Sequence, residues 1–405
     1  MEHGLKLGAI PENAYSDYKY DVIFNAYKWD PQIGDQNTIA KNAVLMEPET
    51  ASKLEQWAEQ LSVETMRMEE SLIHRLPLAG KLGLPKKIQA ELHRLKDYDR
   101  GRNVRLMRFD FHPTENGWAV SEVNSDVPGG LAEASVLPGI ASRHFDGYAP
   151  RGNVGETILD AWRDRIKKGG AVALVHATSY SDDRQVMQFL GDLFEHRGYR
   201  VLYAAPDHIR WVDRKAHSII PGFSGELDGV IRFFPLEWLI NLPKKTNWPG
   251  YFECQTPACN HATAILTQSK RLPLVWDELG VDVPVWKQLL PQTKDPKSLS
   301  LKNPDNDWIF KPALGRVGEG ISIKGAETEK IIRSIEKSAR RRPVDWVAQR
   351  MFKSCPLPGQ DGQYWHLCIG VFTVDGKSAG FYGRAGLLPR IDANAVDIPV
   401  LVEGG

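Results

Sequence analysis

A short stretch near the first quarter of the chain concentrates charged and amide side chains. RFDFHPTENGWAVSEVNSD, residues 108–126, contains Arg108, Asp110, Glu122 and Asn124. Carboxylate and amide oxygens are hard donors that suit Mg²⁺, which is commonly held by one or two carboxylates with substrate phosphates and water. Arg108 could stabilise the charge of a phosphoryl group during its transfer. These residue types therefore favour magnesium-assisted phosphoryl chemistry.

Two strands are needed to hold these side chains together. The sequence predicts strands at 104–111 and 118–123, and the intervening HPTENG contains Asn-Gly, a strong hairpin signal. Residues two apart on a strand share a face, so the four polar side chains can converge on one surface. The alternative is a charged hairpin whose acids pair with Arg105 or Arg108.

A second group of candidate residues lies in KPALGRVGEG, residues 311–320. Bare glycine backbone can approach phosphates closely, Lys311 can reach phosphate oxygens, and Arg316 can neutralise developing charge. The chain has neither a Walker loop nor the motif set of protein kinases. Together the two groups indicate a nucleotide–magnesium enzyme, without fixing its reaction. The glycines concerned are Gly315, Gly318 and Gly320.

A glycine pair follows the first group. Gly129 and Gly130 precede a helical run, so their N–H groups could hold a carboxylate or phosphate. The commoner explanation is a turn that needs positive φ.

Composition excludes several other classes of protein. The chain has 405 residues, 42% of them hydrophobic, which is typical of a globular protein. Lys+Arg and Asp+Glu are both 51, so charge gives no reason to expect nucleic acid or a membrane surface as partner. No apolar run approaches the roughly 20 residues that span a bilayer, and no signal peptide is visible. Four cysteines suit a reducing compartment, so we expect a cytoplasmic enzyme.

Hydrophobic spacing predicts the elements around the candidate residues. Apolar side chains in 48–76 recur at spacings of three, four and seven, typical of a core-facing helix. Residues 171–177 are a buried-strand run, a helix ending at Gly198 follows, and further strands are expected at 201–205 and 229–234. This order predicts a parallel α/β unit. No G-x-G-x-x-G opens its helix, so no dinucleotide is expected there.

The C-terminal part is expected to mix short helices with strands. Residues 262–279 predict a helix that is broken or kinked at Pro273. Residues 307–325 predict a strand, a glycine-rich turn and a strand. A helix capped by Thr328 follows, and strands close the chain.

The ordered motifs resemble the synthetase domain of the glutathionylspermidine synthase family, whose members are ATP-grasp carboxylate–amine ligases. RFDF…SEVNSD resembles that family's Arg-x-Asp and Glu-x-Asn pair, and FKPALGRVGEG resembles its Lys-Pro…Gly-Arg-x-Gly loop. NHATAILTQSKRLPLVWDEL is similar to its Asn…Lys-x-x-x-Pro-x-x-Trp segment, and GFYGRAG to a late strand ending in arginine. The resemblance runs from about residue 100 to the C-terminus. The Glu-x-Asn precedes both lysines, as the family's circularly permuted arrangement would give.

The resemblance implies a role for each matching residue. Asp110, Glu122 and Asn124 would hold Mg²⁺, and the glycine loop would close over the phosphates of ATP. Arg108 and Arg384 would stabilise an acyl-phosphate and a tetrahedral intermediate. The remaining assignments are Lys270 and Lys311 on the phosphates, Arg316 near the transferred phosphate, and Gln349 at the adenine pocket, where the backbone of Arg350 and Met351 would meet the base.

The implied fold is an α/β ATP-grasp fold with a Rossmann-like pre-ATP-grasp subdomain and an N-terminal helical region. The expected divisions are 1–100 for the helical region, 101–165 for the metal-ligand hairpin, 166–260 for the Rossmann-like subdomain and 261–405 for the nucleotide-binding lobes. The implied reaction joins a small-molecule or peptide carboxylate to an amine, through an acyl-phosphate, with release of ADP and phosphate. A catalytically silent relative that binds a peptide or partner, and a small-molecule kinase, stay open as alternatives.

The chain departs from the family pattern in two places. Val127, Pro128 and Gly129 stand where the polyamine-conjugating members carry serines, which disfavours glutathione as the acid. The amidase that some members carry in front is missing, so no hydrolytic half-reaction is expected. Asp182 and Asp183 stand near the family's acidic pair for the amine, but acids are also favoured in the first turn of a helix, and we favour that explanation.

Overall fold

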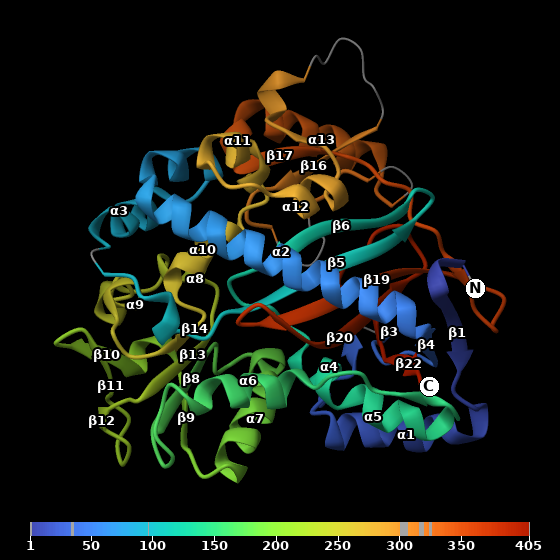
Figure 1. Ribbon diagram of the computed structural model, residues 1–405, viewed down its shortest axis with the longest axis horizontal. Coiled ribbons are helices and arrows are strands. Elements are labelled where there is room, and N and C mark those ends of the chain that lie inside the picture. The colour runs from blue at the N-terminus through green and yellow to red at the C-terminus, as the bar shows by residue number, and fades with distance from the viewer. Residues whose placement is uncertain are drawn as a thin grey trace.

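A five-strand antiparallel path forms the sheet that carries the candidate residues (Figure 1). The structure is a computed structural model that describes residues 2–33, 36–95, 97–299, 307–315, 320–323 and 326–404. The strand order is β21-β20-β19-β5-β6, with β18 pairing beside β19. The bounds are β5 Leu106–Thr114, β6 Gly117–Asn124, β18 Leu357–Pro358, β19 Tyr364–Val374, β20 Lys377–Gly386 and β21 Val396–Ile398.

The predicted hairpin is confirmed, with a longer second strand than expected. Gly117 has φ +98° at the turn, a conformation that glycine adopts at little cost. In the β5–β6 register, Arg108 lies opposite Asn124 and Asp110 lies opposite Glu122. The sheet therefore brings the four polar residues to one face.

The other face of this sheet is apolar and lies under a long helix. α2 (Pro48–His74) crosses the sheet in Figure 1 and packs against β19 and β20. Phe109 and Phe111 are fully buried in the core, and Trp57 of α2 stacks on Phe111. The predicted helix is confirmed, because its apolar stripe has this apolar face to cover.

The predicted parallel unit is also confirmed, as a sheet of order β14-β13-β8-β9. β13 pairs in parallel with β8, and β8 pairs in parallel with β9. Gly198 has φ +85° after the helix, as its predicted role at the helix end requires. The elements are α6 Val154–Arg163, β8 Ala171–His176, α7 Ser181–His196, β9 Arg200–Ala204, β13 Gly229–Phe233 and β14 Ala258–Cys259.

Strands as well as helices make up the first hundred residues. β4 is entirely buried and pairs in parallel with β22 near the C-terminus, so the two ends of the chain share one sheet. That sheet has the order β1-β4-β22-β7. The elements are β1 Leu5–Ala9, α1 Glu12–Asn25, β4 Asn42–Met46, α3 Lys86–Arg94, β7 Tyr148–Ala149 and β22 Val400–Glu403.

A small three-stranded sheet carries the second candidate group. Its order is β15-β17-β16, and α13 (Glu329–Arg341) packs beside it with Thr328 as the predicted N-cap. A second strand was expected in 307–325, but the described residues 320–323 form none. Instead the hydroxyl of Ser322 accepts the N–H of Phe310, where a partner strand would offer a carbonyl. The strands are β15 Thr293–Lys294, β16 Trp308–Pro312 and β17 Trp346–Arg350.

The helical stretch expected at 262–279, with a break or kink at Pro273, is broken, but the first break comes earlier than expected. The chain forms short helical pieces, which include α10 (Ile265–Gln268) and α11 (Trp276–Leu279), and it is extended at Ser269, before Pro273. The reason is tertiary, because the N–H of Lys270 donates to the carbonyl of Ala313 at 2.9 Å instead of to its own helix.

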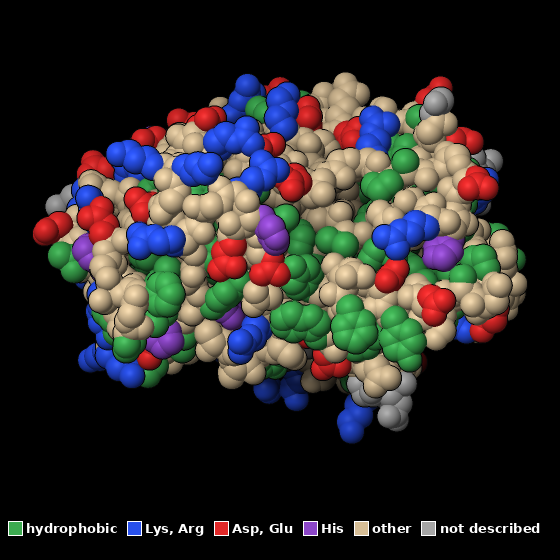
Figure 2. Space-filling model, turned by 90° about the horizontal axis from the view of Figure 1, so that it is seen from below, with side chains coloured by type: hydrophobic (Ala, Val, Ile, Leu, Met, Phe, Trp, Pro, Cys, Tyr) green, Lys and Arg blue, Asp and Glu red, His purple; other side chains and the backbone are tan. Residues whose placement is uncertain are grey.

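Side chains of both charge signs are spread over the face shown in Figure 2, as the equal totals of acids and bases lead one to expect. In the described ranges, no helix combines the length and apolar character needed to cross a bilayer.

Candidate active site

Arg108 and Asp110 form a closed ion pair on β5. The guanidinium donates from Nε to Oδ1 of Asp110 at 2.7 Å and from Nη2 to Oδ2 at 3.0 Å. Asn124 adds a bond from Nδ2 to Oδ2 at 3.0 Å. The pairing of an acid with Arg108, which the sequence left open, is therefore present, whereas Arg105 pairs with Glu69 of α2.

Arg108 is enclosed on its remaining sides as well. Its Nη1 donates to the carbonyl of Gly129 at 2.7 Å, and its guanidinium lies over the ring of Tyr382, 4.9 Å from the centroid. A Cβ at Gly370 would lie 2.8 Å from Cδ of Arg108, so the glycine leaves the space that this side chain crosses. Burial lowers the pKa of Arg108, but Asp110 outweighs it and the net shift is upward. The guanidinium stays charged.

Two lysines from distant segments meet the partner strand β6. Lys270 Nζ lies 2.8 Å from Oε2 of Glu122 and donates to the carbonyl of Gly315 at 2.6 Å. Lys311 Nζ donates to Oε1 of Gln349 at 2.7 Å and lies 3.5 Å from the carbonyl of Ser121. The metal-ligand group and the lysine group of the sequence analysis therefore face each other across a few ångströms.

This arrangement shifts two pKa values in functionally relevant directions. Burial raises the pKa of Glu122, but Lys270, Lys311 and Arg108 outweigh it and lower the net value to about 2. Burial lowers the pKa of Lys311 to about 8, against an opposing effect of Glu122. Glu122 is therefore a fixed anion at neutral pH, while Lys311 can lose its proton in the mildly alkaline range.

A pocket opens beside the Glu122–Lys270 pair. Its empty volume is about 360 Å³, part of which is open to solvent. Its lining combines polar residues, among them Glu122, Lys270 and Gln349, with six apolar ones. Such a mixture is typical of a small-molecule site, in which apolar walls bind and a few polar groups orient. The apolar side chains are Val123, Leu272, Pro273, Trp276, Trp286 and Leu290.

The remaining residues assigned to ATP are the backbone at the expected adenine pocket and the glycine loop. The N–H groups of Arg350 and Met351 already donate to the carbonyls of Gln292 and Asp307, at 2.8 and 2.6 Å, so these two donors are used within the protein. The expected contact of an adenine base with this backbone stays a prediction. Gly320 has φ +68°, as a glycine turn requires, and Arg316 and Gly318 lie outside the described residues.

Arg384 of β20 lies on the same sheet face as Arg108 and Asp110, two strands away from β5. It stands opposite Cys368 of β19 and Asp397 of β21, and its guanidinium donates to the carbonyl of Asp392. The hydroxyl of Tyr382 donates to Asp397 at 2.7 Å. Arg384 and the Arg108–Asp110 pair thus belong to one polar surface, with Tyr382 between them.

A partly buried lysine from the N-terminal region completes this surface, and the sequence analysis missed it. Lys28 Nζ lies 2.7 Å from Asp397 and 2.9 Å from Glu133. Burial lowers the pKa of Lys28, but the two carboxylates outweigh it and the net shift is upward. The sequence around Lys28 does not predict this pairing, because the region has weak periodicity and both partners are more than a hundred residues away in the chain.

The two remaining motifs lie at a tight turn and at the start of a helix. Gly130 has φ +87°, and a Cβ there would lie 2.9 Å from the ring of Tyr382, so this turn needs glycine. The helix after it, α4 (Leu131–Ser135), is a short one. Asp182 and Asp183 lie in the first turn of α7, as predicted.

The donor set fits Mg²⁺ in its chemistry. Glu122 is anionic, and Asp110 and Asn124 supply further hard oxygens next to it. Among the described residues there is no cluster of three His, Cys, Asp or Glu side chains suited to a metal, so a third protein ligand here would be an amide. Both Asp110 oxygens already accept bonds from Arg108 or Asn124, and a metal ion would share them.

Comparisons with known proteins agree with this geometry. The family model described as glutathionylspermidine synthase preATP-grasp matches residues 16–401, so the family includes most of the N-terminal region that the motif resemblance left out. The putative acid–amine ligase of Haemophilus influenzae is 23% identical over 286 residues, which cover 67% of this chain and 68% of that protein.

A solved structure has the same fold. A glutathione synthetase-like effector from Globodera pallida, in its apo form, superposes with a TM-score of 0.66 at 11% identity, over 96% of this chain and 98% of that one. At this identity the likeness concerns the fold alone, and the predicted α/β ATP-grasp fold is confirmed. The chain therefore belongs to the glutathionylspermidine synthase family of carbon–nitrogen bond-forming ligases.

Proposed function

We propose that this chain is an ATP- and Mg²⁺-dependent ligase that joins a small-molecule or peptide carboxylate to an amine and releases ADP and phosphate. The observation that supports the proposal best is the convergence of Lys270 and Lys311 on the Glu122 strand, beside a pocket lined by both polar and apolar side chains. A nucleotide has the matching character, because its base is flat and largely apolar on its faces and its phosphates are anionic.

The nucleotide would lie with its phosphates at the two lysines. Trp276 and Leu290 are apolar lining residues that would cover the base, and Gln349, which also lines the pocket, accepts a hydrogen bond from Lys311. In this structure, the ammonium of Lys270 is held by Glu122 and the carbonyl of Gly315. A phosphate oxygen would take the place of one of these partners.

Phosphoryl transfer would occur at the sheet face where Asp110 of β5 lies opposite Glu122 of β6. Arg108 is fixed by four hydrogen-bond and ring contacts, so its positive charge needs little rearrangement when charge develops on a nearby phosphoryl group. Mg²⁺, held by Asp110, Glu122 and Asn124, would neutralise charge between the acid and the phosphates.

The reaction would proceed in two balanced steps. A carboxylate oxygen attacks the γ-phosphorus, the bond to the β-phosphate oxygen breaks, and ADP leaves. The amine nitrogen then attacks the acyl carbon, the phosphate leaves, and the nitrogen loses a proton. Arg384, on the same face, would stabilise the tetrahedral intermediate of the second step.

Product analysis tests the reaction type. The protein is incubated with ATP, Mg²⁺, hydroxylamine and a panel of carboxylic acids, and we expect ADP, phosphate and a hydroxamate. AMP with pyrophosphate would contradict the mechanism. A stable phosphorylated product that forms without any amine would instead identify a small-molecule kinase, and a lack of ATP binding in calorimetry would identify a silent relative.

A pair of variants tests the site. Glu122→Gln is expected to lower turnover by about 10²–10³-fold, as the loss of one preorganised electrostatic partner does, with the fold kept. Lys311→Ala is expected to abolish turnover in the same way. Glu115→Gln on the exposed turn of the same hairpin is the matched control and should retain activity. Strongly lowered melting temperatures in both site variants would indicate that these side chains are structural.

A further inference from the structure

The segment 267–270 contacts the end of the metal-ligand hairpin at three points. The hydroxyls of Thr267 and Ser125 lie 2.7 Å apart. Oε1 of Gln268 accepts the backbone N–H groups of Ser125 and Asp126, both at 2.8 Å. Lys270 then pairs with Glu122. The segment that carries a proposed phosphate-binding lysine is therefore tied directly to the strand that carries the proposed metal ligands.

The two ends of the Gln268 amide have different surroundings. The side chain is 3% exposed and its carbonyl oxygen is fully used by the two backbone donors. Its Nε2 has no hydrogen-bond partner among the residues that the structure describes, and Gln268 lines the pocket beside Glu122 and Lys270. The amide therefore has an acceptor that serves the protein and a donor left for a ligand.

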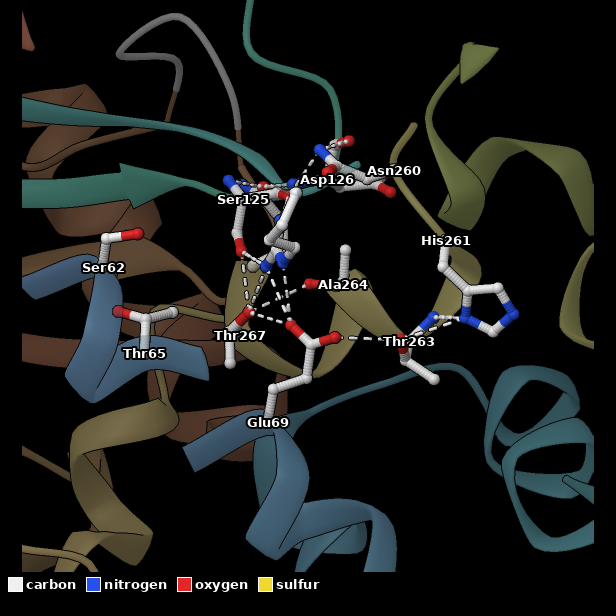
Figure 3. A network of polar contacts seen from close by, with 12 residues as sticks. Ser62, Thr65, Glu69, Ser125, Asp126, Asn260, His261, Thr263, Ala264 and Thr267 are labelled. Atoms are coloured by element: carbon white, nitrogen blue, oxygen red, sulfur yellow. Dashed lines mark hydrogen bonds and ion pairs between the residues drawn. The ribbon is translucent and has the colours of Figure 1, made fainter. Parts of the chain in front are cut away.

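The backbone that Gln268 holds is fixed from its other side by a buried network (Figure 3). Arg105 donates to the carbonyl of Ser125 at 2.6 Å and to its hydroxyl, and it pairs with Glu69 of α2. Figure 3 shows Glu69 pointing from α2 toward Thr263 and Thr267, to which it is hydrogen-bonded. Residues 125–126 are therefore held by this network and by Gln268, and Gln268 is the link that lies next to Lys270 in the chain.

We propose that Gln268 is a positioning and nucleotide-contacting residue of the ligase site. Its carbonyl sets the separation between the Glu122 strand and Lys270, and its NH₂ donates to the nucleotide in the pocket. This inference rests on the proposed function. It goes beyond the family motifs, which carry Lys270 but no role for the residue two positions before it. A misplacement of about 1 Å between such groups costs of the order of 10²-fold in rate.

Two substitutions separate the two ends of the amide. Gln268→Glu keeps an acceptor for both N–H groups but replaces the NH₂ donor by an anionic oxygen that faces the phosphates. Gln268→Met keeps the approximate size and removes both the acceptor and the donor. Gln363→Glu, at an exposed glutamine, adds the same charge elsewhere and is the matched control.

The readouts are affinity for a Mg²⁺ complex of a non-hydrolysable ATP analogue, measured by calorimetry, and kcat and KM for ATP. We expect Gln268→Glu to weaken analogue binding at least about tenfold, with a smaller fall in kcat than in Gln268→Met. Gln268→Met should lower kcat at saturating ATP at least about tenfold. The control should behave like the wild type.

Other results would overturn the inference in distinguishable ways. Unchanged analogue affinity in Gln268→Glu would show that the NH₂ does not face the nucleotide. A lower melting temperature in Gln268→Met, with unchanged kcat and KM, would make Gln268 purely structural. In both cases the proposed function would survive. A wild-type protein that does not bind the analogue would overturn both proposals together.

Discussion

β5 and β8 are both buried along their entire lengths, yet their side chains differ sharply in character. In β8, alternate residues enter two apolar clusters, with Ala173 on one side and Leu174 on the other. In β5, Phe109 and Phe111 enter the core while Arg108 and Asp110 occupy the opposite face. Apolar side chains thus cover both faces of β8, whereas β5 has one face that belongs to the site.

The comparison shows that buried charged side chains occur on the strand that carries the site, β5. A charge taken out of water is tolerated only when it is paired and hydrogen-bonded. Arg108 has Asp110 and a carbonyl as partners, and Asp110 also has Asn124. Apart from its strand pairing, β8 is held at residues 171–175 by apolar side chains in two core clusters, so we expect β8 to supply stability and β5 to supply chemistry. The predictions below test this division.

The largest expected effect is at the ion pair of β5. Asp110→Ala leaves the Arg108 guanidinium buried without its counterion, so the free energy of unfolding should fall by about 3–5 kcal/mol. Denaturant unfolding measures it. The double variant Arg108→Met with Asp110→Leu should recover most of this stability, because an apolar pair replaces the ion pair, but should stay inactive. A loss below about 1 kcal/mol in Asp110→Ala would show that the pair is not desolvated.

The matching change in β8 should affect stability alone. Leu174→Ala removes a fully buried side chain and should lower the free energy of unfolding by about 3 kcal/mol. KM for ATP and kcat per folded molecule should not change, because Leu174 belongs to an apolar core cluster and does not line the pocket. Val212→Ala, at a half-exposed position, serves as the control. A raised KM in Leu174→Ala would contradict the separation of stability from chemistry.

Lys311 should give a smaller effect that depends on pH. Its folded pKa of about 8 lies below the ordinary 10.5, so the folded state binds fewer protons than the unfolded state between these values. The cost of burying the charged lysine is therefore present in full below pH 8 and disappears as pH rises toward 10.5. Lys311→Met should raise the free energy of unfolding at pH 7 by about 1 kcal/mol. The gain from removing the buried charge exceeds the loss of the hydrogen bond from Lys311 to Gln349.

Kinetics provide a second measure of the same lysine. In the wild type, kcat/KM for ATP should fall as pH rises above about 8, because this ratio reports groups of the unliganded enzyme. Lys311→Arg, which stays charged, should lose this decline even if its activity is low. A flat profile between pH 7 and 10 in the wild type would show that Lys311 does not act through its charge.

The smallest effect is expected at a surface ion pair. Arg333 and Glu329 on α13 lie 2.7 Å apart, yet their side chains are 77% and 85% exposed. Arg333→Ala should change the free energy of unfolding by less than ~0.5 kcal/mol, since exposed pairs are screened by water and salt. A loss comparable to that of Asp110→Ala would undermine the contrast between buried and exposed pairs.

The sequence alone determined the local parts of this protein. The hairpin of β5 and β6, the helix at 48–74 and the parallel unit at 171–233 follow from turn chemistry and hydrophobic period, which act over neighbouring residues. The order of motifs was likewise sufficient to identify the family. Residues with the chemistry of a nucleotide–magnesium site could therefore be named in advance.

Only the tertiary structure decided how these parts meet. It pairs Asp110 with Arg108 and brings Lys270 into an ion pair with Glu122. It also places Lys28 between the carboxylates of Asp397 and Glu133. It also breaks the helix expected at 262–279, because Lys270 is drawn to Ala313. These contacts link residues up to several hundred positions apart, and their free energies arise from packing and desolvation that no local pattern contains.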